Sequence, residues 1–288
     1  MDERMKRKIK GILQTSGLNK VIQSFSRIFK DDVINLIKED VRKSFFLTLT
    51  ECTSLKPEII KDLLKRINIV QKNVLCAHDE FELYVMQAMI LALSVRGPII
   101  EFGCYKGGTT AKLSLICKLT GRKLYAFDSF EGLPLPNKQD LKHDYMPMIL
   151  TKKIVQYSKG GFAGSLEEVK NNVKIYGNIE VCEFIKGYFE DTLPDFKIKP
   201  ACIFMDVDFI ESAQTIIKHM WPKLLPGGLL FSHEGLVVDY IKAITNISWW
   251  EKNLNQKPPL LYGAGYGCCW RSNNIAFASN IVYFKKEM

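Results

Sequence analysis

From Gly97 onward, short and strongly apolar segments alternate with longer segments of helical periodicity. The segments PIIEFG, KLYAFD, IEVCEFIKG, ACIFMDV and GGLLFSH have the length of strands. Runs this apolar leave no face suited to solvent, which is typical of parallel strands with helices on both faces. Helices are predicted between them at about 109–119, 166–176 and 212–221. This alternation predicts a doubly wound α/β fold, whose ligand binds outside the carboxyl ends of the strands.

The first 95 residues instead show apolar side chains at helical spacing. One apolar face runs from Val33 to Phe45, and a second runs from Ile59 to Ile67 behind Pro57, a residue tolerated in a first helical turn. A third helix is expected at about 79–94. The pattern therefore predicts two parts, a helical extension over residues 1–95 and an α/β domain over residues 96–288. In the tail, YGAGYGCCW is expected to be a loop, and IAFAS and IVYFKK are expected to add two antiparallel edge strands.

Composition excludes several classes of protein. The 288 residues include 47% hydrophobic and 25% charged side chains, which is typical of a globular chain and not of disorder or a coiled coil. No apolar run reaches the ~20 residues that cross a bilayer, and the basic N-terminus lacks the apolar core of a secretory signal. The eight cysteines contain no CxxC pair, as expected for buried thiols in a reducing compartment. We therefore expect a cytoplasmic protein without a membrane span.

The net charge of +9 is concentrated near the N-terminus, where residues 1–80 carry 16 basic and 11 acidic side chains. A basic helical face of this kind either binds an acidic partner or is simply solvated. Because the basic residues are not interleaved with aromatic ones, we favour the solvated face and expect no nucleic-acid partner. The sequence leaves the oligomeric state open, with a homo-oligomer among the options.

A glycine-rich turn follows the first predicted strand and reads EFGCYKGGTT from Glu101 to Thr110. It is neither the G-x-G-x-x-G dinucleotide motif nor a P-loop, because no G-K-[ST] follows. The second strand ends in Asp128, 27 residues after Glu101, where a carboxylate is placed to accept the hydroxyls of a ribose. Two acidic strand ends suit S-adenosylmethionine, which carries an ammonium, a sulfonium and a ribose but no phosphate. NAD remains an alternative if the turn can hold a pyrophosphate.

Three stretches of the chain resemble the macrocin O-methyltransferase family. They are IIEFGCYKGGTT, LYAFDSFEGLP, and a long block from FAGSLEEVKNNVKIYG through IKGYFEDTLP to FMDVDFIESAQTIIKHMWPKLLPGGLLF. The likeness covers about residues 70–240. It implies a Rossmann-like class I methyltransferase fold, with a mostly parallel sheet between two helical layers, that uses S-adenosylmethionine to methylate a hydroxyl. In this family the hydroxyl is typically on a sugar of a natural product, and a divalent cation assists.

The resemblance also implies roles for particular residues. It places one group around the methionine part of the cofactor, a second at the ribose and a third near the adenine. These groups are Glu101, Gly103, Tyr105, Gly107, Gly108 and Thr109, then Asp128 and Ser129, then Gly187, Tyr188 and Phe189. For the chemistry it implies Asp206 as a metal ligand and Asp208 as the proton acceptor.

The chain departs from the family after the fifth strand, where two adjacent aspartates and an aromatic residue are replaced by His233, Glu234 and Gly235. His233 follows Asp206 by 27 residues, so the two are expected at the ends of adjacent strands. A metal site of Asp206, His233 and Glu234 is then geometrically feasible. Magnesium prefers oxygen ligands, whereas an imidazole favours manganese, iron or zinc.

Two other interpretations of His233 stay open. It would act as the general base in an enzyme without a metal, or it would be structural in a protein that binds the cofactor without catalysis. The remaining histidines (His78, His143 and His219) fall in no ligand spacing and are expected to be surface or packed residues.

The sequence thus favours an S-adenosylmethionine-dependent O-methyltransferase acting on a hydroxyl of a sugar, a glycoside or a related small metabolite. One alternative is a catalytically altered S-adenosylmethionine-binding protein that acts through a partner docked on its basic helices. An NAD-dependent oxidoreductase is a third hypothesis, which the glycine-rich turn disfavours.

Overall fold

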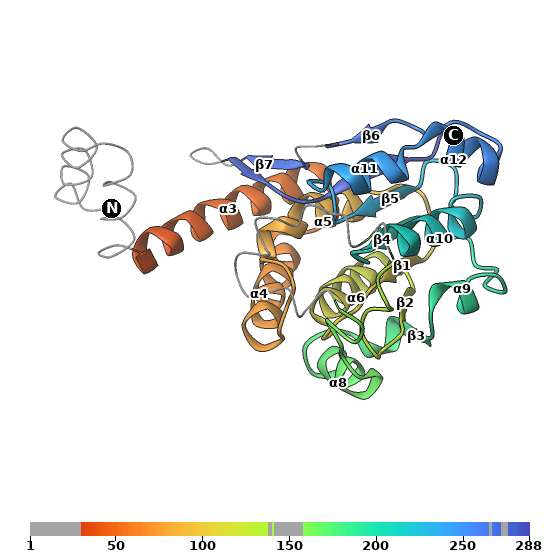
Figure 1. The fold of residues 1–288 in the computed structure, drawn as a ribbon. Helices are drawn as coiled ribbons and strands as arrows, with labels where there is room; N and C mark the ends of the chain where they lie inside the picture. Colours follow the sequence, from red (N-terminus) through yellow and green to blue (C-terminus); the bar gives the residue numbers. More distant parts are fainter. Residues whose placement is uncertain (1–29, 138–139, 141–157, 265–266, 272–275) are drawn as a thin grey trace, which may run out of the picture.

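The computed structural model of the chain describes residues 30–137, 140, 158–264, 267–271 and 276–288 (Figure 1). Residues 1–29 of the expected helical extension and His143 lie outside these ranges. Within the described ranges, no helix combines the length and the apolar character that crossing a bilayer requires.

The centre of the molecule is a seven-stranded sheet with the order β3-β2-β1-β4-β5-β9-β6. The five strands expected from the sequence are all present and mutually parallel, with β1 and β4 at the switch point of the strand order. They are β1 (Ile99–Phe102), β2 (Leu124–Asp128), β3 (Cys182–Lys186), β4 (Cys202–Met205) and β5 (Leu229–Ser232). The predicted Rossmann-like fold class is therefore confirmed.

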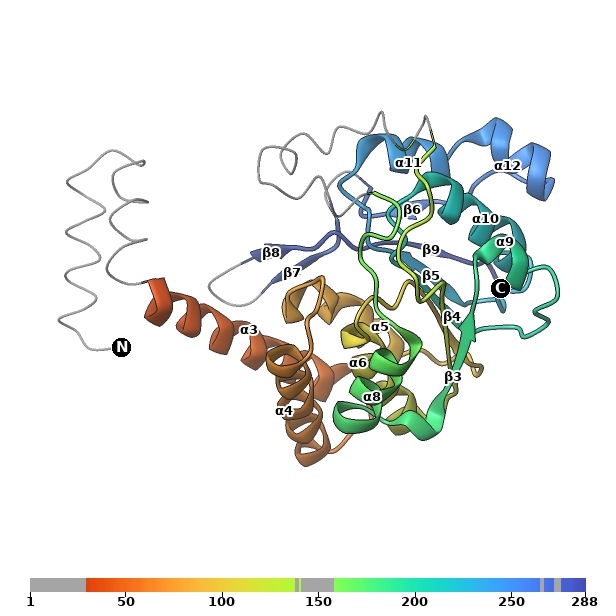
Figure 2. The same cartoon turned by 60° about the horizontal axis from the view of Figure 1, so that its bottom comes forward.

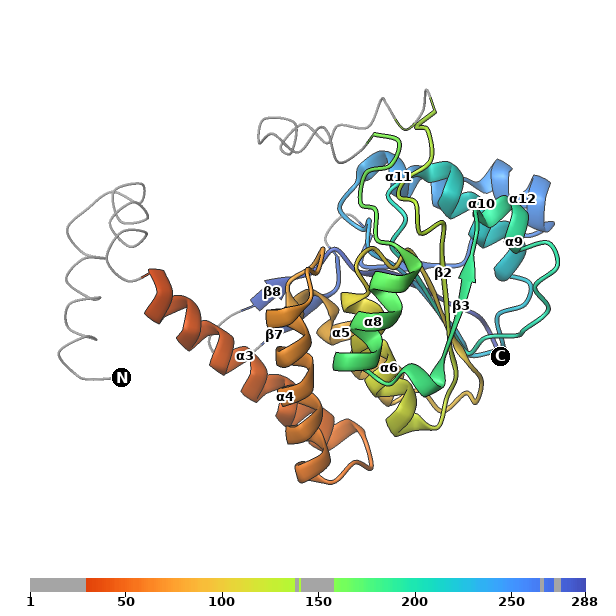
Figure 3. The ribbon, with the colours of Figure 1, turned by 90° about the horizontal axis from the view of Figure 1, so that it is seen from below.

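Two helical layers cover the sheet, because alternate side chains of the buried strands point to opposite faces (Figure 3). One layer contains α4 (Pro57–Asn73), α5 (Tyr84–Leu91), α6 (Gly108–Thr120) and α8 (Leu166–Tyr176), which pack on residues such as Ile99 and Phe204. The other layer contains α10 (Ile210–Met220), α11 (Val238–Ile244) and α12 (Ile247–Leu254), which pack on residues such as Ile100 and Phe102. The short helix α9 (Phe189–Thr192) lies beside α10.

The three helices expected before residue 95 are also present. They are α3 (Lys30–Cys52), α4, and the third helix, which begins as the 3-10 turn η1 (Glu80–Leu83) and continues as α5. The beginning of α3 projects from the body of the molecule, whereas its end packs on α4 and α5 (Figure 2). There Phe45 stacks on Tyr84 with ring centroids 3.9 Å apart, and Arg42 forms an ion pair with Glu80. These contacts fix the segment that leads from α4 into α5.

The tail differs from the expectation in two ways. IVYFKK forms β9 (Val282–Lys285), which is antiparallel to β5 but does not lie at the sheet edge, because β6 (Leu261–Tyr262) pairs beyond it. IAFAS contributes β8 (Ala276–Ala278), which pairs with β7 (Cys269–Arg271) in a separate two-stranded sheet, so Cys269 and Trp270 at the end of the expected loop belong to a strand. Local patterns indicate strands, but they do not say which partner a strand will find.

The edge strand β3 also departs from the expectation of fully buried strands. Glu183 and Lys186 are exposed, whereas every residue of β1, β4 and β5 is buried. An edge strand has a neighbour on one side only, and charged side chains there discourage pairing with another chain.

Candidate functional site

A cavity of about 810 Å³ opens at the carboxyl ends of the parallel strands. Each of the strands β1 to β5 contributes lining residues at its end or just after its last position: Gly103, Asp128, Gly187, Asp206 and His233. Ligand sites commonly measure about 300–1,000 Å³, and in open α/β sheets they lie at this edge, beside the switch point. The cavity is therefore the place where the fold itself favours a ligand.

The turn after β1 packs directly against the end of β4. Gly103 has φ 89°, and a Cβ built on it would lie 2.0 Å from the carbonyl oxygen of Asp206. The backbone N–H of Asp206 donates to the carbonyl of Phe102 at 2.9 Å. Only glycine fits here, because any side chain would push the two strand ends apart.

Asp128 holds the glycine-rich turn in place. Its carboxylate accepts backbone N–H groups from Cys104 at 2.7 Å, Tyr105 at 3.4 Å and Phe130 at 2.7 Å. Burial raises the pKa of Asp128, and these backbone hydrogen bonds oppose the rise. Asp128 also lines the cavity, so a ribose at this position would meet a carboxylate whose orientation is already fixed.

The structure brings together most, but not all, of the residues expected around the cofactor. The cavity is lined by Gly103, Tyr105, Asp128, Ser129, Gly187, Tyr188 and Phe189. The residues that do not line it are Glu101, Gly107, Gly108 and Thr109. Glu101 is fully buried beneath the turn, and the space beside Gly107 and Gly108 is filled by Val169 and Cys76, so their small size serves packing within the protein.

Beside the end of β4, His78, Asp206 and His233 form a compact cluster that lines the same cavity. His78 Nε2 lies 2.5 Å from Asp206 Oδ2, and His233 Nδ1 lies 3.8 Å from Asp206 Oδ1. The centroids of the two imidazole rings are 3.6 Å apart. The expectation that Asp206 and His233 end adjacent strands is confirmed, since β4 pairs with β5 and the His233 N–H donates to the Met205 carbonyl.

Glu82 completes the surroundings of this cluster. Its carboxylate oxygen Oε2 lies 3.0 Å from His233 Nε2, and Glu234 Oε1 lies 3.6 Å from His233 Nδ1. Burial alone would lower the pKa of His233, but hydrogen bonds with Glu234 and Glu82 and the charge of Asp206 raise it to about 10. Burial likewise opposes ionisation of Asp206, yet the charges of His78 and His233 lower its pKa. Without a bound metal, this arrangement keeps His233 as an imidazolium at neutral pH.

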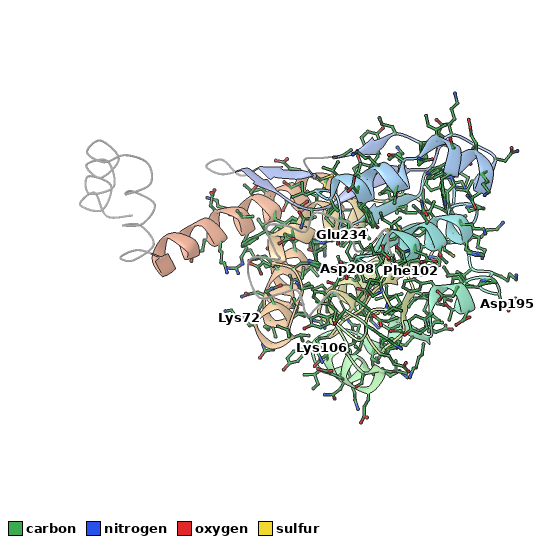
Figure 4. All side chains as sticks on the ribbon, viewed as in Figure 1. Lys72, Phe102, Lys106, Asp195, Asp208 and Glu234 are labelled. Atoms are coloured by element: carbon green, nitrogen blue, oxygen red, sulfur yellow. The ribbon has the colours of Figure 1, made fainter. Side chains whose placement is uncertain are left out.

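Asp208 lies near Glu234 (Figure 4), within reach of the charges of Glu234 and Asp206. Burial raises the pKa of Asp208 well above its usual range, and the charges of Glu234 and Asp206 raise it further. Its backbone is left-handed, with φ 57°, and the cavity-lining Tyr105 has φ 49°. Left-handed non-glycine residues are uncommon and concentrate at functional sites, so the backbone is held in place here by its surroundings.

Two members of the cluster are not among the residues that the sequence indicates. His78 is 6% exposed, as expected for a packed residue, but it lies against Asp206, a neighbour that its place in the sequence does not indicate. Glu82 is absent from the expected site, although its place four residues after His78, at the start of the predicted helix, is an available signal. His219 lies in the last turn of α10 and does not line the cavity. The three residues whose donor atoms gather are thus His78, Asp206 and His233, without Glu234.

Comparisons with known proteins agree with this geometry. The model of the macrocin O-methyltransferase family matches residues 80–263. The chain is 30% identical over 146 residues to the 8-demethyl-8-(2,3-dimethoxy-alpha-L-rhamnosyl)-tetracenomycin-C 4'-O-methyltransferase of Streptomyces olivaceus, covering 49% of this chain and 54% of that protein. It is 29% identical over 140 residues to the mycinamicin III 3''-O-methyltransferase of Micromonospora griseorubida, covering 46% and 53%. The matches therefore span about half the length of these curated relatives.

Among solved structures, the O-methyltransferase NovP superposes with a TM-score of 0.52 at 21% identity, over 78% of this chain and 81% of that one. At this identity the likeness concerns the fold. It agrees with the parallel sheet and the two helical layers described above.

Proposed function

Because the chain belongs to the macrocin O-methyltransferase family, we propose that it transfers the methyl group of S-adenosylmethionine to a hydroxyl of a sugar, a glycoside or a related small metabolite. The observation that carries this proposal is a single cavity in which the expected donor end, at Gly103 and Asp128, adjoins Asp206, Asp208 and His233. Donor and acceptor bound in one cavity would meet in the orientation that methyl transfer needs.

The charge of the cavity supports a cationic donor. Seven carboxyl groups line it, against one lysine and two histidines. The carboxyl groups belong to Glu82, Asp128, Glu190, Asp206, Asp208, Glu234 and Asp239, and the lysine is Lys242. Such a lining attracts the ammonium and sulfonium of S-adenosylmethionine and repels the pyrophosphate of NAD. The lining of described residues therefore disfavours the oxidoreductase alternative.

The residues at the β4 and β5 ends suggest how a hydroxyl loses its proton. His233, with a pKa of about 10, is already protonated at neutral pH and is poorly suited to accept a proton in this arrangement. Asp208 lines the same cavity two positions after Asp206, and the family resemblance implies a proton acceptor at this position. We therefore favour Asp208 as the group that receives the proton while the oxygen attacks the methyl carbon.

The acceptor would lie between the loop after β5 and the start of α11. This wall of the cavity contains Leu236, Val237 and Val238, beside Asp239 and Lys242. Leu236 and Val238 are 47% and 59% exposed, so the apolar rim has room to cover an apolar part of a bound molecule. A glycoside offers both features, a sugar for the polar groups and an apolar aglycone for the rim.

Calorimetry with S-adenosylhomocysteine and with NAD tests the donor. We expect binding of S-adenosylhomocysteine, loss of at least about tenfold in affinity for Asp128→Asn, and no change for Asp195→Asn, a matched exposed aspartate outside the cavity (Figure 4). Tighter binding of NAD would overturn the proposal.

Methyl transfer is then measured with isotopically labelled S-adenosylmethionine and a panel of rhamnosides and other glycosides. We expect Asp208→Asn to lower the turnover rate by about 100-fold or more with little change in S-adenosylhomocysteine affinity. Binding of S-adenosylhomocysteine without transfer to any glycoside would favour the alternative of a binding protein that acts through a partner.

The division of the chain at residue 95 and its cytoplasmic location stay predictions. His78 and Glu82 precede that division and nevertheless line the same cavity as Asp206. We therefore propose that the helices before residue 95 form part of the functional unit.

A further inference from the structure

We propose that His78, Asp206 and His233 bind a first-row transition-metal dication, with His78 supplied by the segment between α4 and η1. This inference concerns the chemistry of the site proposed above for methyl transfer, but metal binding is measurable without that activity. It replaces Glu234, the third ligand expected from the sequence, with a histidine from the N-terminal helices.

The three side chains offer donor atoms at separations close to those of a metal site. One donor atom from each residue lies within 4.8 Å of the others. Metal–ligand bonds of about 2.05 Å place neighbouring ligands roughly 2.9–3.3 Å apart and opposite ones about 4.1 Å apart. His78 Nε2 and Asp206 Oδ2, at 2.5 Å, would separate by roughly half an ångström, and His233 Nδ1, at 3.8 Å from Asp206 Oδ1, lies between the separations of neighbouring and opposite ligands.

Glu82 has the position of a carboxylate that orients metal-bound imidazoles. It contacts His233 through Nε2 at 3.0 Å, which leaves Nδ1 on the side of Glu234 Oε1 at 3.6 Å and Asp206 Oδ1 at 3.8 Å. The same oxygen lies 3.9 Å from His78 Nδ1, which leaves Nε2 of that ring directed toward Asp206. Histidine ligands in metal sites usually donate their second ring N–H to such a carboxylate, which fixes the tautomer and the ring orientation. One carboxylate thus faces the outer nitrogen of both rings.

The segment carrying His78 is held from beneath by buried polar contacts. The carbonyl of His78 accepts Gln71 Nε2 at 3.0 Å, and Gln71 Oε1 accepts Lys112 Nζ at 2.5 Å. Lys112 is fully buried in α6, so this chain of contacts joins His78 to the helix that follows the glycine-rich turn. A buried lysine and a half-buried amide that fix one carbonyl are typical of a site whose side chain must keep a precise position.

Gly108 lets the same segment approach α6. A Cβ at Gly108 would lie 2.3 Å from the sulfur of Cys76, two residues before His78. Any larger residue would push this segment away from the helix start and carry His78 away from Asp206. The glycine expected to make room for a ligand therefore makes room for the chain that supplies a ligand residue.

The donor set selects the kind of metal. Magnesium prefers an all-oxygen site, whereas two imidazoles and one carboxylate suit zinc, iron, manganese, cobalt or nickel. The three residues line the cavity, so the remaining coordination positions face the proposed acceptor. A dication bound there would lower the pKa of a hydroxyl that reaches it.

The test is equilibrium metal binding by the full chain after treatment with a chelator. We expect one Zn²⁺ or Co²⁺ per chain, with Mg²⁺ at least about 100-fold weaker, and visible absorption bands from Co²⁺ in a protein site. His78→Ala and His233→Ala should each weaken Zn²⁺ binding by about 100-fold or more, and Glu82→Gln by about 10- to 100-fold. The matched control His219→Ala should bind like the unaltered chain.

Circular dichroism and S-adenosylhomocysteine affinity, measured on every variant, separate loss of ligands from loss of fold and from failure of the proposed donor site. The first measurement is the affinity of the unaltered chain for each metal ion. If that chain binds Zn²⁺ and Co²⁺ no more tightly than Mg²⁺, the proposal is overturned. It is also overturned by a pattern in which Glu234→Gln weakens Zn²⁺ binding more than His78→Ala does, because the metal would then sit among Asp206, His233 and Glu234.

Discussion

Replacing Glu101 with glutamine should change how the stability of this protein depends on pH. The side chain of Glu101 is fully buried at the end of β1, and within the described residues neither of its carboxyl oxygens has a hydrogen bond of good geometry. Burial raises its pKa from 4.5 to about 8, with the charges of Asp206 and Asp128 adding to the rise and the nearby Thr110 hydroxyl opposing it. The native protein therefore keeps a proton on Glu101 at neutral pH, whereas the unfolded chain releases it.

The sign and size of the effect follow from this difference. Because the pKa of Glu101 is higher in the folded protein than in the unfolded chain, its contribution to the free energy of unfolding is fully present below pH 4.5. That contribution is lost as pH rises to about 8. One proton corresponds to at most about 1.4 kcal/mol per pH unit. Over the interval between the two pKa values, the loss amounts to roughly 5 kcal/mol, an upper estimate because a strained protein can relax or admit water. Glutamine has nearly the same shape and no titratable proton.

The assay is urea denaturation followed by circular dichroism at pH 5, 6, 7, 8 and 9. We expect the free energy of unfolding of Glu101→Gln, minus that of the unaltered chain, to rise steadily with pH up to about pH 8 and then to level off. Glu183→Gln, an exposed glutamate on β3, serves as the matched control and should show no such trend. A difference that stays constant from pH 5 to pH 9 would refute the reasoning, because Glu101 would then be ionised in the folded protein.

Two further substitutions probe the packing that positions the site. Gly103→Ala should lower the free energy of unfolding by about 3 kcal/mol or more and weaken S-adenosylhomocysteine binding, because its Cβ would lie 2.0 Å from the Asp206 carbonyl oxygen. The control is Gly121→Ala, where φ is also positive but a Cβ would meet no atom within 4 Å. It should lower the free energy of unfolding by only about 1 kcal/mol in urea denaturation. Trp250→Ala should cost about 3–5 kcal/mol in the same assay, since the indole is fully buried and its N–H donates to Ile244; a loss under 1 kcal/mol would contradict this packing.

The sequence is sufficient for the sheet and for the positions of its acidic strand ends. Strand-length apolar runs and capped helices are local signals, and parallel strands place their carboxyl ends at one edge, so the order of residues alone assigns Asp128, Asp206 and His233 to a common edge. The adjacency of β4 and β5 follows from the fold class. Local patterns are weaker in the tail, where β7 and β8 pair with each other and β9 lies inside the sheet.

What only the tertiary structure decided is which side chains reach the cavity from distant parts of the chain. His78 lies 128 positions from Asp206, and Glu82 lies 151 positions from His233. Their approach depends on how α3, α4 and α5 pack on one another and on the absence of a side chain at Gly108. Likewise, the glycine-rich turn indicates that Glu101 lies at the end of a strand. The complete burial of the Glu101 side chain, however, depends on the helices that pack on the two faces of the sheet. Periodicity along a chain encodes which face of an element is apolar, whereas contacts between elements depend on the shapes of surfaces that meet only in the folded protein.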